Sequence, residues 1–263
     1  MTPAVSHMDM QQPRLKTNVC YDILGKSITV VVPTYNEKDN IPILAKRVFD
    51  LGLPNIEIVI VDDRSPDDSA NIARNLSPQY DDKITVIERE SKQGLGTAYI
   101  VGFEKALELT SDYIVQMDAD LSHSPEYIPD MLLALADADV VVGSRYRKKG
   151  RIESNWRYSR KFLSTVANWA IRIITNLKVR DVTSGFKAYK RSVLEEVDLT
   201  AIRCKGFSFQ TEVAYICQKN GYSVIEYPIM FNERTAGDSK LSLKIIIEAM
   251  WCLTLLRFRT TLY

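Results

Sequence analysis

The chain has 263 residues, of which 46% are hydrophobic and 25% are charged. This composition excludes a disordered chain, a collagen-like repeat and a small disulfide scaffold, and the length fits one sizeable α/β domain better than two independent ones. Lysines and arginines number 34 against 33 aspartates and glutamates, so the net charge of +1 gives the chain as a whole no bias toward polyanions.

The first half of the chain predicts an α/β core. Residues 1–26 have no hydrophobic periodicity and are expected to form a flexible N-terminal extension. From residue 27 onward, short β-branched runs alternate with segments of helical length, which indicates βα units around a mostly parallel sheet. The expected strands are Ile28–Val32, Ile56–Val61, Ile84–Ile87, Tyr113–Met117 and Val140–Val142. Because these strands are mostly apolar, helices are expected on both faces of the sheet.

The second half is less regular. Its expected elements are an amphipathic helix near Ser159–Asn176, a strand near Phe186–Tyr189, a helix from about Phe209, a strand near Ser223–Tyr227 and a final helix over about Ser242–Leu256. The main domain is therefore expected to span residues 27–241, followed by a C-terminal amphipathic helix and tail over 242–263.

The cysteine spacing and the lengths of the apolar runs indicate a cellular compartment and test for a bilayer-spanning segment. The four cysteines lie far apart without a CxxC pair, so neither a zinc site nor a disulfide framework is expected; they are Cys20, Cys204, Cys217 and Cys252. A reducing, cytosolic compartment follows from this spacing. The longest apolar run, Ile245–Leu256, is interrupted by Glu248 and is shorter than the roughly 20 residues that span a bilayer.

Polar residues follow three of the expected strands directly. They are Pro33-Thr34-Tyr35-Asn36-Glu37, Asp62-Asp63 and Asp118-Ala119-Asp120. Open α/β sheets bind ligands beyond the carboxyl ends of their strands, so these segments are candidate site residues. Asp118 and Asp120 suit Mg²⁺ or Mn²⁺ shared with a diphosphate, although one of them could instead cap the next helix.

Two further motifs have structural alternatives. Asp62-Asp63 is compatible with a turn, and functionally a strand-end aspartate accepts hydrogen bonds from a base or a ribose. Gly94-Leu95-Gly96 is interpreted as a turn and helix start, because Tyr99 stands where the third glycine of a dinucleotide-binding fingerprint would be and no Lys-Ser/Thr follows.

The ordered set of motifs over about residues 28–245 resembles family 2 glycosyltransferases and, more narrowly, the dolichol-phosphate (polyprenol-phosphate) mannose synthases. Besides the strand-end segments, the matching motifs are Gly94-Leu95-Gly96-Thr97-Ala98-Tyr99, Gly143-Ser144-Arg145-Tyr146, Asp181-Val182-Thr183-Ser184-Gly185-Phe186, Phe209-Gln210-Thr211-Glu212 and Arg234-Thr235-Ala236-Gly237-Asp238-Ser239-Lys240. The resemblance implies a GT-A (Rossmann-like) fold, with a mostly parallel sheet flanked by helices and amphipathic, membrane-facing helices in the second half.

The resemblance also assigns roles to individual residues. The residues that it implies for the guanosine of GDP-mannose are Pro33, Tyr35, Glu37, Val61 and Asp63. Asp118, Ala119 and Asp120 would hold the diphosphate, and the two aspartates would hold its divalent metal, Mg²⁺ or Mn²⁺. The residues that match family positions at the donor or acceptor phosphates are Arg145, Arg234 and Lys240, which with Asp120 form the expected catalytic set.

The chain departs from the family pattern in two places. Ser122 is a candidate donor-binding residue, but some relatives carry a metal-binding Gln at this position. Arg64 and Asp68 stand at turn positions that are often Gly in relatives. The roles of Glu212 and Lys205 are left open by the sequence.

The segment Arg145–Lys161 concentrates positive charge. It holds eight basic residues against Glu153, a local charge of +7, so the rest of the chain carries −6. A solvated basic loop is the ordinary interpretation, and attraction to an anionic membrane or to nucleic acid competes with it. The following helix favours the membrane through an apolar stripe of Phe162, Val166, Trp169 and Ile173, a pattern that a core-facing helix shares.

Together these observations predict an inverting hexosyltransferase that moves mannose from GDP-mannose to dolichyl or polyprenyl phosphate, giving a β-phosphomannose. The phosphate monoester needs little help from a general base because its second pKa is about 6. The expected place is the cytosolic face of the cell membrane or endoplasmic reticulum, with a membrane-anchoring subunit as a further expected partner and no nucleic acid. The alternatives are another donor, UDP-glucose or UDP-GlcNAc, and a nucleic-acid-binding or non-catalytic nucleotide-binding module.

Overall fold

A seven-stranded sheet forms the centre of the protein. The computed structural model describes residues 25–146, 151–152, 158–204, 206 and 208–231. In spatial order the strands are β3 (Ile84–Glu88), β2 (Ile56–Asp62), β1 (Ile28–Thr34), β4 (Tyr113–Gln116), β7 (Lys187–Lys190), β5 (Val140–Ser144) and β8 (Val224–Pro228). Only β7 in this sheet runs antiparallel to its neighbours, so the predicted α/β class with a mostly parallel sheet is confirmed.

All five strands that the apolar runs predict are present, and β1, β2, β3 and β5 continue beyond the predicted ends. β1 reaches Thr34 and β2 reaches Asp62, and these two residues are neighbours in the parallel register. The Thr34 hydroxyl donates to Asp62 Oδ1 at 2.8 Å, and both side chains are buried. Because the two polar groups satisfy each other, the strands continue into the edge of the sheet without an apolar sequence.

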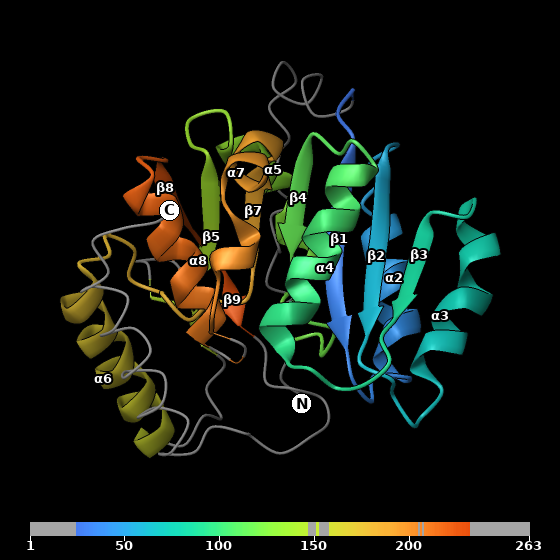
Figure 1. Cartoon of the computed structure of the whole chain (residues 1–263), viewed down its shortest axis with the longest axis horizontal. Helices are drawn as coiled ribbons and strands as arrows, with labels where there is room; N and C mark the ends of the chain where they lie inside the picture. The colour runs from blue at the N-terminus through green and yellow to red at the C-terminus, as the bar shows by residue number, and fades with distance from the viewer. Residues whose placement is uncertain (1–24, 147–150, 153–157, 205, 207, 232–263) are drawn as a thin grey trace, which may run out of the picture.

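Helices cover both faces of the sheet, as Figure 1 shows. One layer consists of α2 (Asn40–Phe49), α3 (Ser69–Leu76) and α5 (Ile128–Ala134), and the other of α4 (Leu95–Glu108), α7 (Arg191–Glu196) and α8 (Ser208–Lys219). Ile41 and Leu44 of α2 belong to the first apolar core, whereas Phe103 of α4 and Phe209 of α8 belong to the second. The two cores lie on opposite sides of the strands because side chains alternate between the faces of a sheet.

The remaining elements are short, except for one helix at the periphery. They are the 3-10 helices Ser77–Tyr80, Pro125–Tyr127 and Leu199–Ala201, the two-stranded parallel pair β6 (Arg151–Ile152) and β9 (Met230–Phe231), and α6 (Tyr158–Thr175). α6 lies at the outer edge of the molecule beyond α8 (Figure 1). The amphipathic helix predicted near Ser159–Asn176 is therefore present, whereas the predicted N-terminal extension and the predicted final helix lie outside the described residues.

The glycines before α4 have the structural role that was predicted for them. Gly94 precedes the helix with φ 107°, a conformation that side chains with a Cβ rarely adopt. A Cβ on Gly96 would lie 2.7 Å from the carbonyl oxygen of Cys204 and 2.8 Å from the Phe209 ring. This segment is thus a turn and a closely packed helix start, as the interpretation of Gly94-Leu95-Gly96 required.

The prediction from cysteine spacing is wrong at one position. Cys204 is disulfide-bonded, while Cys217 on α8 is a buried free thiol. Spacing along the chain did not indicate this bond because disulfides depend on distances in the folded protein. Within the described ranges, every helix falls short of the length and apolar character that a bilayer-spanning helix needs.

Candidate active site

The three strand-end segments predicted to carry the chemistry lie at one edge of the sheet. Pro33 at the end of β1 is paired in register with Val61 at the end of β2. β4 runs parallel to β1 on its other side, and the Met117 amide just after β4 donates to the carbonyl oxygen of Val31 at 3.2 Å. Because β7 is antiparallel, its first residues lie at this same edge and bring the preceding loop, residues 181–186, to the site.

Asp62 and Asp63 have different roles. Asp62 is fully buried and accepts hydrogen bonds from the Ser65 amide at 2.7 Å and the Ser65 hydroxyl at 2.6 Å, so it builds the turn after β2. Asp63 forms an ion pair with Arg89, with 2.7 Å between Oδ1 and Nε and both side chains only 7% exposed. Burial raises the pKa of the Asp63 carboxyl, and the Arg89 charge acts against this effect. Asp63 is therefore the one of the two that remains a candidate for nucleoside binding.

The turn after β2 explains why glycine would suit two of its positions. Arg64 has φ 55° and Asp68 has φ 72°, both in the left-handed region. Each is held by a local hydrogen bond: Arg64 Nη1 donates to the Glu90 carbonyl at 2.9 Å, and Asn71 Nδ2 donates to Asp68 Oδ1 at 2.6 Å. The turn keeps the conformation that glycine favours although this chain has larger residues there.

The loop after β1 is anchored by contacts of Tyr35 and Glu37 with neighbouring residues. The Tyr35 ring lies under the Lys92 ammonium, 3.4 Å from Nζ to the ring centroid, in a cation–π contact. Glu37 Oε2 accepts from Asn40 Nδ2 at 2.7 Å, and the Glu37 amide donates to the Ser69 hydroxyl at 3.0 Å. The predicted guanosine-binding residues thus lie on adjoining, well-anchored segments at the ends of β1 and β2.

Asp118 is oriented from two sides. The fully buried Tyr99 hydroxyl donates to Asp118 Oδ1 at 2.8 Å. On the other side Gly185 approaches so closely that a Cβ there would lie 2.8 Å from Asp118 Oδ2. Burial, together with the Asp118 charge, raises the pKa of the Tyr99 hydroxyl well above its usual value, which keeps it a hydrogen-bond donor. The Asp118 carboxylate itself is 27% exposed and is accessible to a ligand.

Asp120 is more deeply buried than Asp118. Its Oδ1 accepts from the Ser122 amide at 3.1 Å and from the Ser122 hydroxyl at 2.5 Å. Leu121, with φ 60°, takes the backbone out of the extended conformation directly after Asp120. Ser122, which stands where some relatives have Gln, therefore orients a candidate metal ligand through its hydroxyl.

The aspartate pair fits a hard divalent cation. Carboxylate oxygens are the ligands that Mg²⁺ and Mn²⁺ prefer, and Mg²⁺ is commonly held by one or two carboxylates plus substrate phosphates. In the described part of the chain no three His, Cys, Asp or Glu side chains form a cluster that could hold a metal ion without help. Asp118 and Asp120 would hold such an ion, with further ligands supplied by a bound diphosphate and by water.

Arg145, at the end of β5, is fixed by a buried carboxylate. Its Nε and Nη2 donate to the two oxygens of Asp181 at 2.7 and 2.6 Å, and Nη2 also donates to the Thr183 hydroxyl at 2.9 Å. Asp181 is fully buried and is held in turn through Glu226, which accepts from the Asp181 amide at 2.9 Å. The paired guanidinium stays positively charged and keeps one orientation beside the site.

His123 lies within the site and is almost fully buried. Its ring packs between Phe186 and Phe231, with centroid distances of 5.3 and 5.4 Å, and its Nδ1 lies 3.8 Å from Asp118 Oδ2. Burial lowers the pKa of His123, although the nearby carboxylates act in the opposite direction. The imidazole is therefore neutral at physiological pH and packs as an aromatic side chain.

A buried polar network lies behind the aspartates. Lys187 at the start of β7 is fully buried, and its Nζ donates to the Ser184 carbonyl at 2.5 Å and to Gln210 Oε1 at 2.6 Å. Gln116 Nε2 donates to the same Gln210 oxygen, and the Tyr189 hydroxyl donates to Gln116 Oε1 at 2.8 Å. Burial lowers the pKa of Lys187 to about 7, and the charges of nearby aspartates oppose this shift.

Of the remaining predicted residues, Glu212 has a clear structural role, and the others lie outside the described residues. Glu212 on α8 is fully buried and accepts from the backbone amides of Arg203 and Cys204 at 3.1 and 2.8 Å, so it supports the loop against which Gly96 packs. Lys205, Arg234 and Lys240 lie outside the described residues. The side chains of the basic segment after Tyr146 do so as well.

Sequence reasoning assigned no role to several residues that support this site. Arg89, Tyr99, Lys187 and Gln210 were not assigned a role there, although the first three contact a predicted residue or its supporting loop and Gln210 contacts Lys187. Tyr99 and Asp118 are 19 positions apart, and Lys187 and Gln210 are 23 apart. One signal in the sequence was a charged residue in an otherwise apolar run, as at Lys187 in the predicted strand Phe186–Tyr189, and Tyr99 and Gln210 lay within motifs that assigned them no role.

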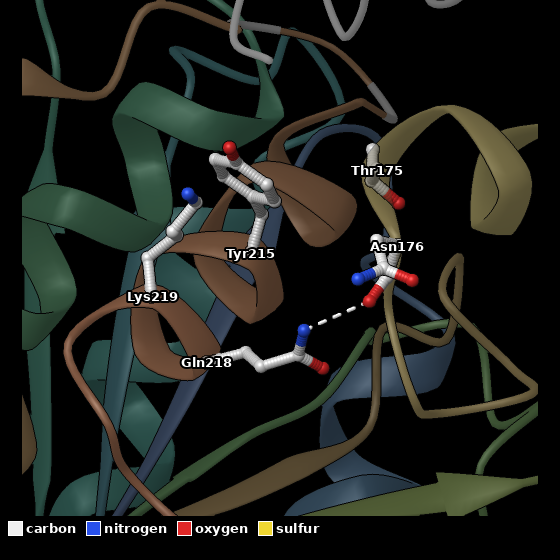
Figure 2. A pocket seen from close by; sticks show the side chains of 5 residues that line it. All are labelled: Thr175, Asn176, Tyr215, Gln218 and Lys219. Atoms are coloured by element: carbon white, nitrogen blue, oxygen red, sulfur yellow. Dashed lines mark hydrogen bonds between the residues drawn. The ribbon is translucent and has the colours of Figure 1, made fainter. Parts of the chain in front are cut away.

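A small pocket of about 340 Å³ lies away from the strand-end site, between the C-terminal end of α6 and α8. Figure 2 shows its lining side chains, with Gln218 Nε2 donating to the Asn176 carbonyl at 2.9 Å. The Lys219 ammonium lies over the Tyr215 ring, 5.8 Å from its centroid. This pocket contains none of the predicted site residues.

Comparison with known proteins agrees with the motifs. A match to the family described as "Glycosyl transferase family 2" covers residues 29–198. The chain is 42% identical over 223 residues to a polyprenol monophosphomannose synthase of Mycolicibacterium smegmatis, covering 84% of this chain and 83% of the relative. It is 39% identical over 223 residues to an undecaprenyl-phosphate mannosyltransferase of Micrococcus luteus, covering 85% and 90%.

Solved structures share the fold at lower identity. Glucosyl-3-phosphoglycerate synthase of Mycobacterium tuberculosis, in complex with Mn²⁺, UDP-glucose and phosphoglyceric acid, matches with a TM-score of 0.65 and 17% identity over 94% of this chain and 85% of that one. A mannosyltransferase of Pyrobaculum calidifontis, in complex with GDP-Man and Mn²⁺, matches with a TM-score of 0.56 and 21% identity over 88% and 71%.

Proposed function

The chain belongs to glycosyl transferase family 2, and from this premise we propose that it transfers mannose from GDP-mannose to the phosphate of a polyprenyl phosphate. Its fold is GT-A, and the candidate residues lie at the carboxyl ends of β1, β2 and β4. Two relatives at 42% and 39% identity are named for mannose transfer to polyprenol carriers. One observation carries the proposal. The candidate metal ligands Asp118 and Asp120 and the candidate nucleoside-binding residue Asp63 lie at the same edge of the sheet, and each is held by a neighbouring side chain.

The chain's own residues would bind the two ends of the donor separately. Asp63, held by Arg89, presents a carboxylate that can accept hydrogen bonds from the N–H groups of guanine. Asp118 and Asp120 would hold Mg²⁺ or Mn²⁺ at the diphosphate. When bound, the metal stabilises the negative charge that develops on the departing nucleoside diphosphate. Arg145 is locked by Asp181 and adds a fixed positive charge to the same region.

The reaction needs no dedicated general base. A phosphate monoester with a second pKa of about 6 is mostly dianionic near neutral pH and is itself the nucleophile. His123 is the histidine at the site, and its buried, neutral ring is packed between two phenylalanines rather than directed as a base. Direct attack of the lipid phosphate on the anomeric carbon inverts α-linked mannose to a β-phosphomannose.

The acceptor requires access to a membrane surface, and α6 carries features that suit it. Val166, Trp169 and Ile173 of its predicted apolar stripe are 42%, 60% and 55% exposed, so these side chains do not face the core. An exposed apolar stripe on a helix that follows a basic segment is typical of helices that lie in the membrane interface. We therefore place the enzyme peripherally on the cytosolic face of a membrane, and a separate anchoring subunit remains part of this proposal.

The membrane proposal is tested with a double variant, Trp169→Ser with Ile173→Ser. We expect it to lose co-sedimentation with liposomes that contain anionic lipid and polyprenyl phosphate. Ile43→Ser is the matched control, because Ile43 is 49% exposed on α2, in the opposite helix layer. Equal binding of the double variant and the parent would contradict a membrane role for α6.

The activity is tested with purified protein, Mn²⁺ or Mg²⁺, a short polyprenyl phosphate and a panel of nucleotide sugars. Lipid-linked product is measured by mass spectrometry. We expect mannosyl product from GDP-mannose and loss of product with Asp120→Ala, while Asp137→Ala, an exposed aspartate in the α5–β5 connection, keeps it. If only a UDP-sugar gave product, the donor would be that sugar nucleotide and not GDP-mannose. Salt-sensitive binding of RNA or DNA without any turnover would contradict the proposal that the protein is an enzyme.

A further inference from the structure

Lys187 is a fully buried lysine directly behind the proposed metal site. In the described part of the chain no carboxylate forms an ion pair with it, and its Nζ donates to the Ser184 carbonyl and to Gln210 Oε1. Burying an ammonium group without a counter-ion is costly, and an apolar side chain of similar length would fill the space without that cost. The position of the ammonium therefore calls for a reason other than packing.

One hydrogen bond of Lys187 fixes the backbone that packs against Asp118. Its acceptor, the Ser184 carbonyl at 2.5 Å, belongs to the peptide that joins Ser184 to Gly185. Gly185 is the residue whose missing Cβ leaves room for the Asp118 carboxylate. The same loop begins at Asp181, which holds Arg145 by two side-chain hydrogen bonds. Displacement of this loop would therefore shift both Asp118 and Arg145.

The other hydrogen bond of Lys187 reaches the strand that carries Asp118. Gln210 Oε1 accepts from Lys187 Nζ at 2.6 Å and also from Gln116 Nε2. Gln116 is the last residue of β4, two positions before Asp118, and is also held by the Tyr189 hydroxyl. The ammonium of Lys187 thus joins the two backbone segments that flank Asp118.

We propose that Lys187 is a positioning residue of the diphosphate site: hydrogen bonds from its Nζ hold the 184–185 peptide and β4 around Asp118. The proposal rests on the proposed function, because it takes Asp118 as a residue of the donor complex. Loss of these hydrogen bonds would loosen Asp118 and so weaken the binding of a nucleoside diphosphate with its metal.

The test is Lys187→Met, which keeps the length of the side chain and removes its charge and hydrogen bonds. Lys190→Met is the matched control, because Lys190 lies on the same strand, is half-buried and pairs with Asp139 at 3.2 Å near the start of β5. Binding of GDP in the presence of Mn²⁺ is measured by calorimetry, and folding by thermal unfolding. We expect Lys187→Met to keep or raise the melting temperature and to weaken GDP binding at least tenfold, while Lys190→Met keeps the parent's affinity.

A merely structural lysine predicts the opposite pair of results. In that case Lys187→Met would melt at a lower temperature, and its folded fraction would bind GDP with Mn²⁺ as the parent does, which would overturn the proposal. If Lys187→Met does not fold, the test uses Gln210→Leu, which keeps the lysine but removes one of its two acceptors. We expect this variant to bind GDP at least threefold more weakly than the parent, and unchanged binding would overturn the proposal. Failure of the parent itself to bind any nucleoside diphosphate with Mn²⁺ would instead contradict the proposed function.

Discussion

Tyr99→Phe removes one hydroxyl from the site and leaves its packing intact. The hydroxyl donates to Asp118 Oδ1 at 2.8 Å, while the ring stacks on Phe209 and Phe103 with centroid distances of 5.7 and 6.0 Å. Phenylalanine keeps both ring contacts. The substitution therefore isolates the effect of a single hydrogen bond on the carboxylate that we place at the metal.

The size of the expected effect follows from the exposure of Asp118. A hydrogen bond to a charged group contributes about 1.5–3 kcal/mol, and partners that orient a metal ligand typically change metal affinity by about 10–100-fold. Asp118 is 27% exposed, so water can replace the lost hydroxyl in part. We therefore expect the lower end of that range, a loss of roughly tenfold in Mn²⁺ affinity, equivalent to about 1.4 kcal/mol.

The assay is a Mn²⁺ titration in the presence of GDP, followed by the electron paramagnetic resonance signal of the free ion. Tyr227→Phe is the matched control, because the Tyr227 hydroxyl also donates to an aspartate, Asp130 at 2.6 Å, away from the strand-end site. It should leave Mn²⁺ affinity unchanged. A Tyr99→Phe protein that binds Mn²⁺ within twofold of the parent would refute the reasoning that orientation of Asp118 by Tyr99 sets metal affinity.

Three other predictions concern the same region. Gly185→Ala places a Cβ 2.8 Å from Asp118 Oδ2, so we expect turnover to fall at least roughly tenfold while circular dichroism is unchanged; normal turnover would show that the close approach does not matter. Asp181→Asn leaves the Arg145 guanidinium without its buried counter-ion and should lower the free energy of unfolding in urea by about 3 kcal/mol, whereas a loss below about 1 kcal/mol would contradict the pairing. The pKa of Lys187 is about 7 in the folded protein, below its unfolded value of 10.5, so above pH 7 the unfolded state binds more protons than the folded state. The free energy of unfolding should therefore rise with pH from 7 to 9, by at most about 1.4 kcal/mol per pH unit. Lys187→Met should remove this slope, and an equal slope in both proteins would assign it to another group.

The sequence predicted the strands and their shared edge because those features depend on local patterns. Apolar runs such as Ile56–Val61 form buried strands wherever they occur in a βα sequence, and the polar residues after them must lie at the carboxyl edge of a parallel sheet. The ends of these two strands were predicted too early, at Val32 and Val61, whereas β1 reaches Thr34 and β2 reaches Asp62. Periodicity treats both residues as loop-forming, whereas in the fold each satisfies the other's hydrogen-bonding group.

The supporting residues were not predictable from the same patterns. Asp63 and Arg89 are 26 positions apart, and only the parallel pairing of β2 with β3 brings them within ion-pair distance. The family motifs contained Asp181 but assigned it no role, because its function is to hold Arg145 through contacts that depend on tertiary structure. The residues expected to bind the ligand could thus be found from motifs, and the residues that orient them could not.

The reversed strand β7 brings a further set of supporting residues to the sheet edge that carries Asp118 and Arg145. In a purely parallel sheet this edge receives only the segments that follow strands, here those after β1, β2, β3, β4, β5 and β8. Because β7 runs the other way between β4 and β5, the segment that precedes it reaches the same edge and places Gly185 against Asp118 and Asp181 against Arg145. Lys187, the first residue of that strand, then lies beneath both. A substitution that shifts the register of β7 should therefore impair binding of the donor diphosphate before it affects the nucleoside side at Asp63, which no residue of β7 contacts in the described structure.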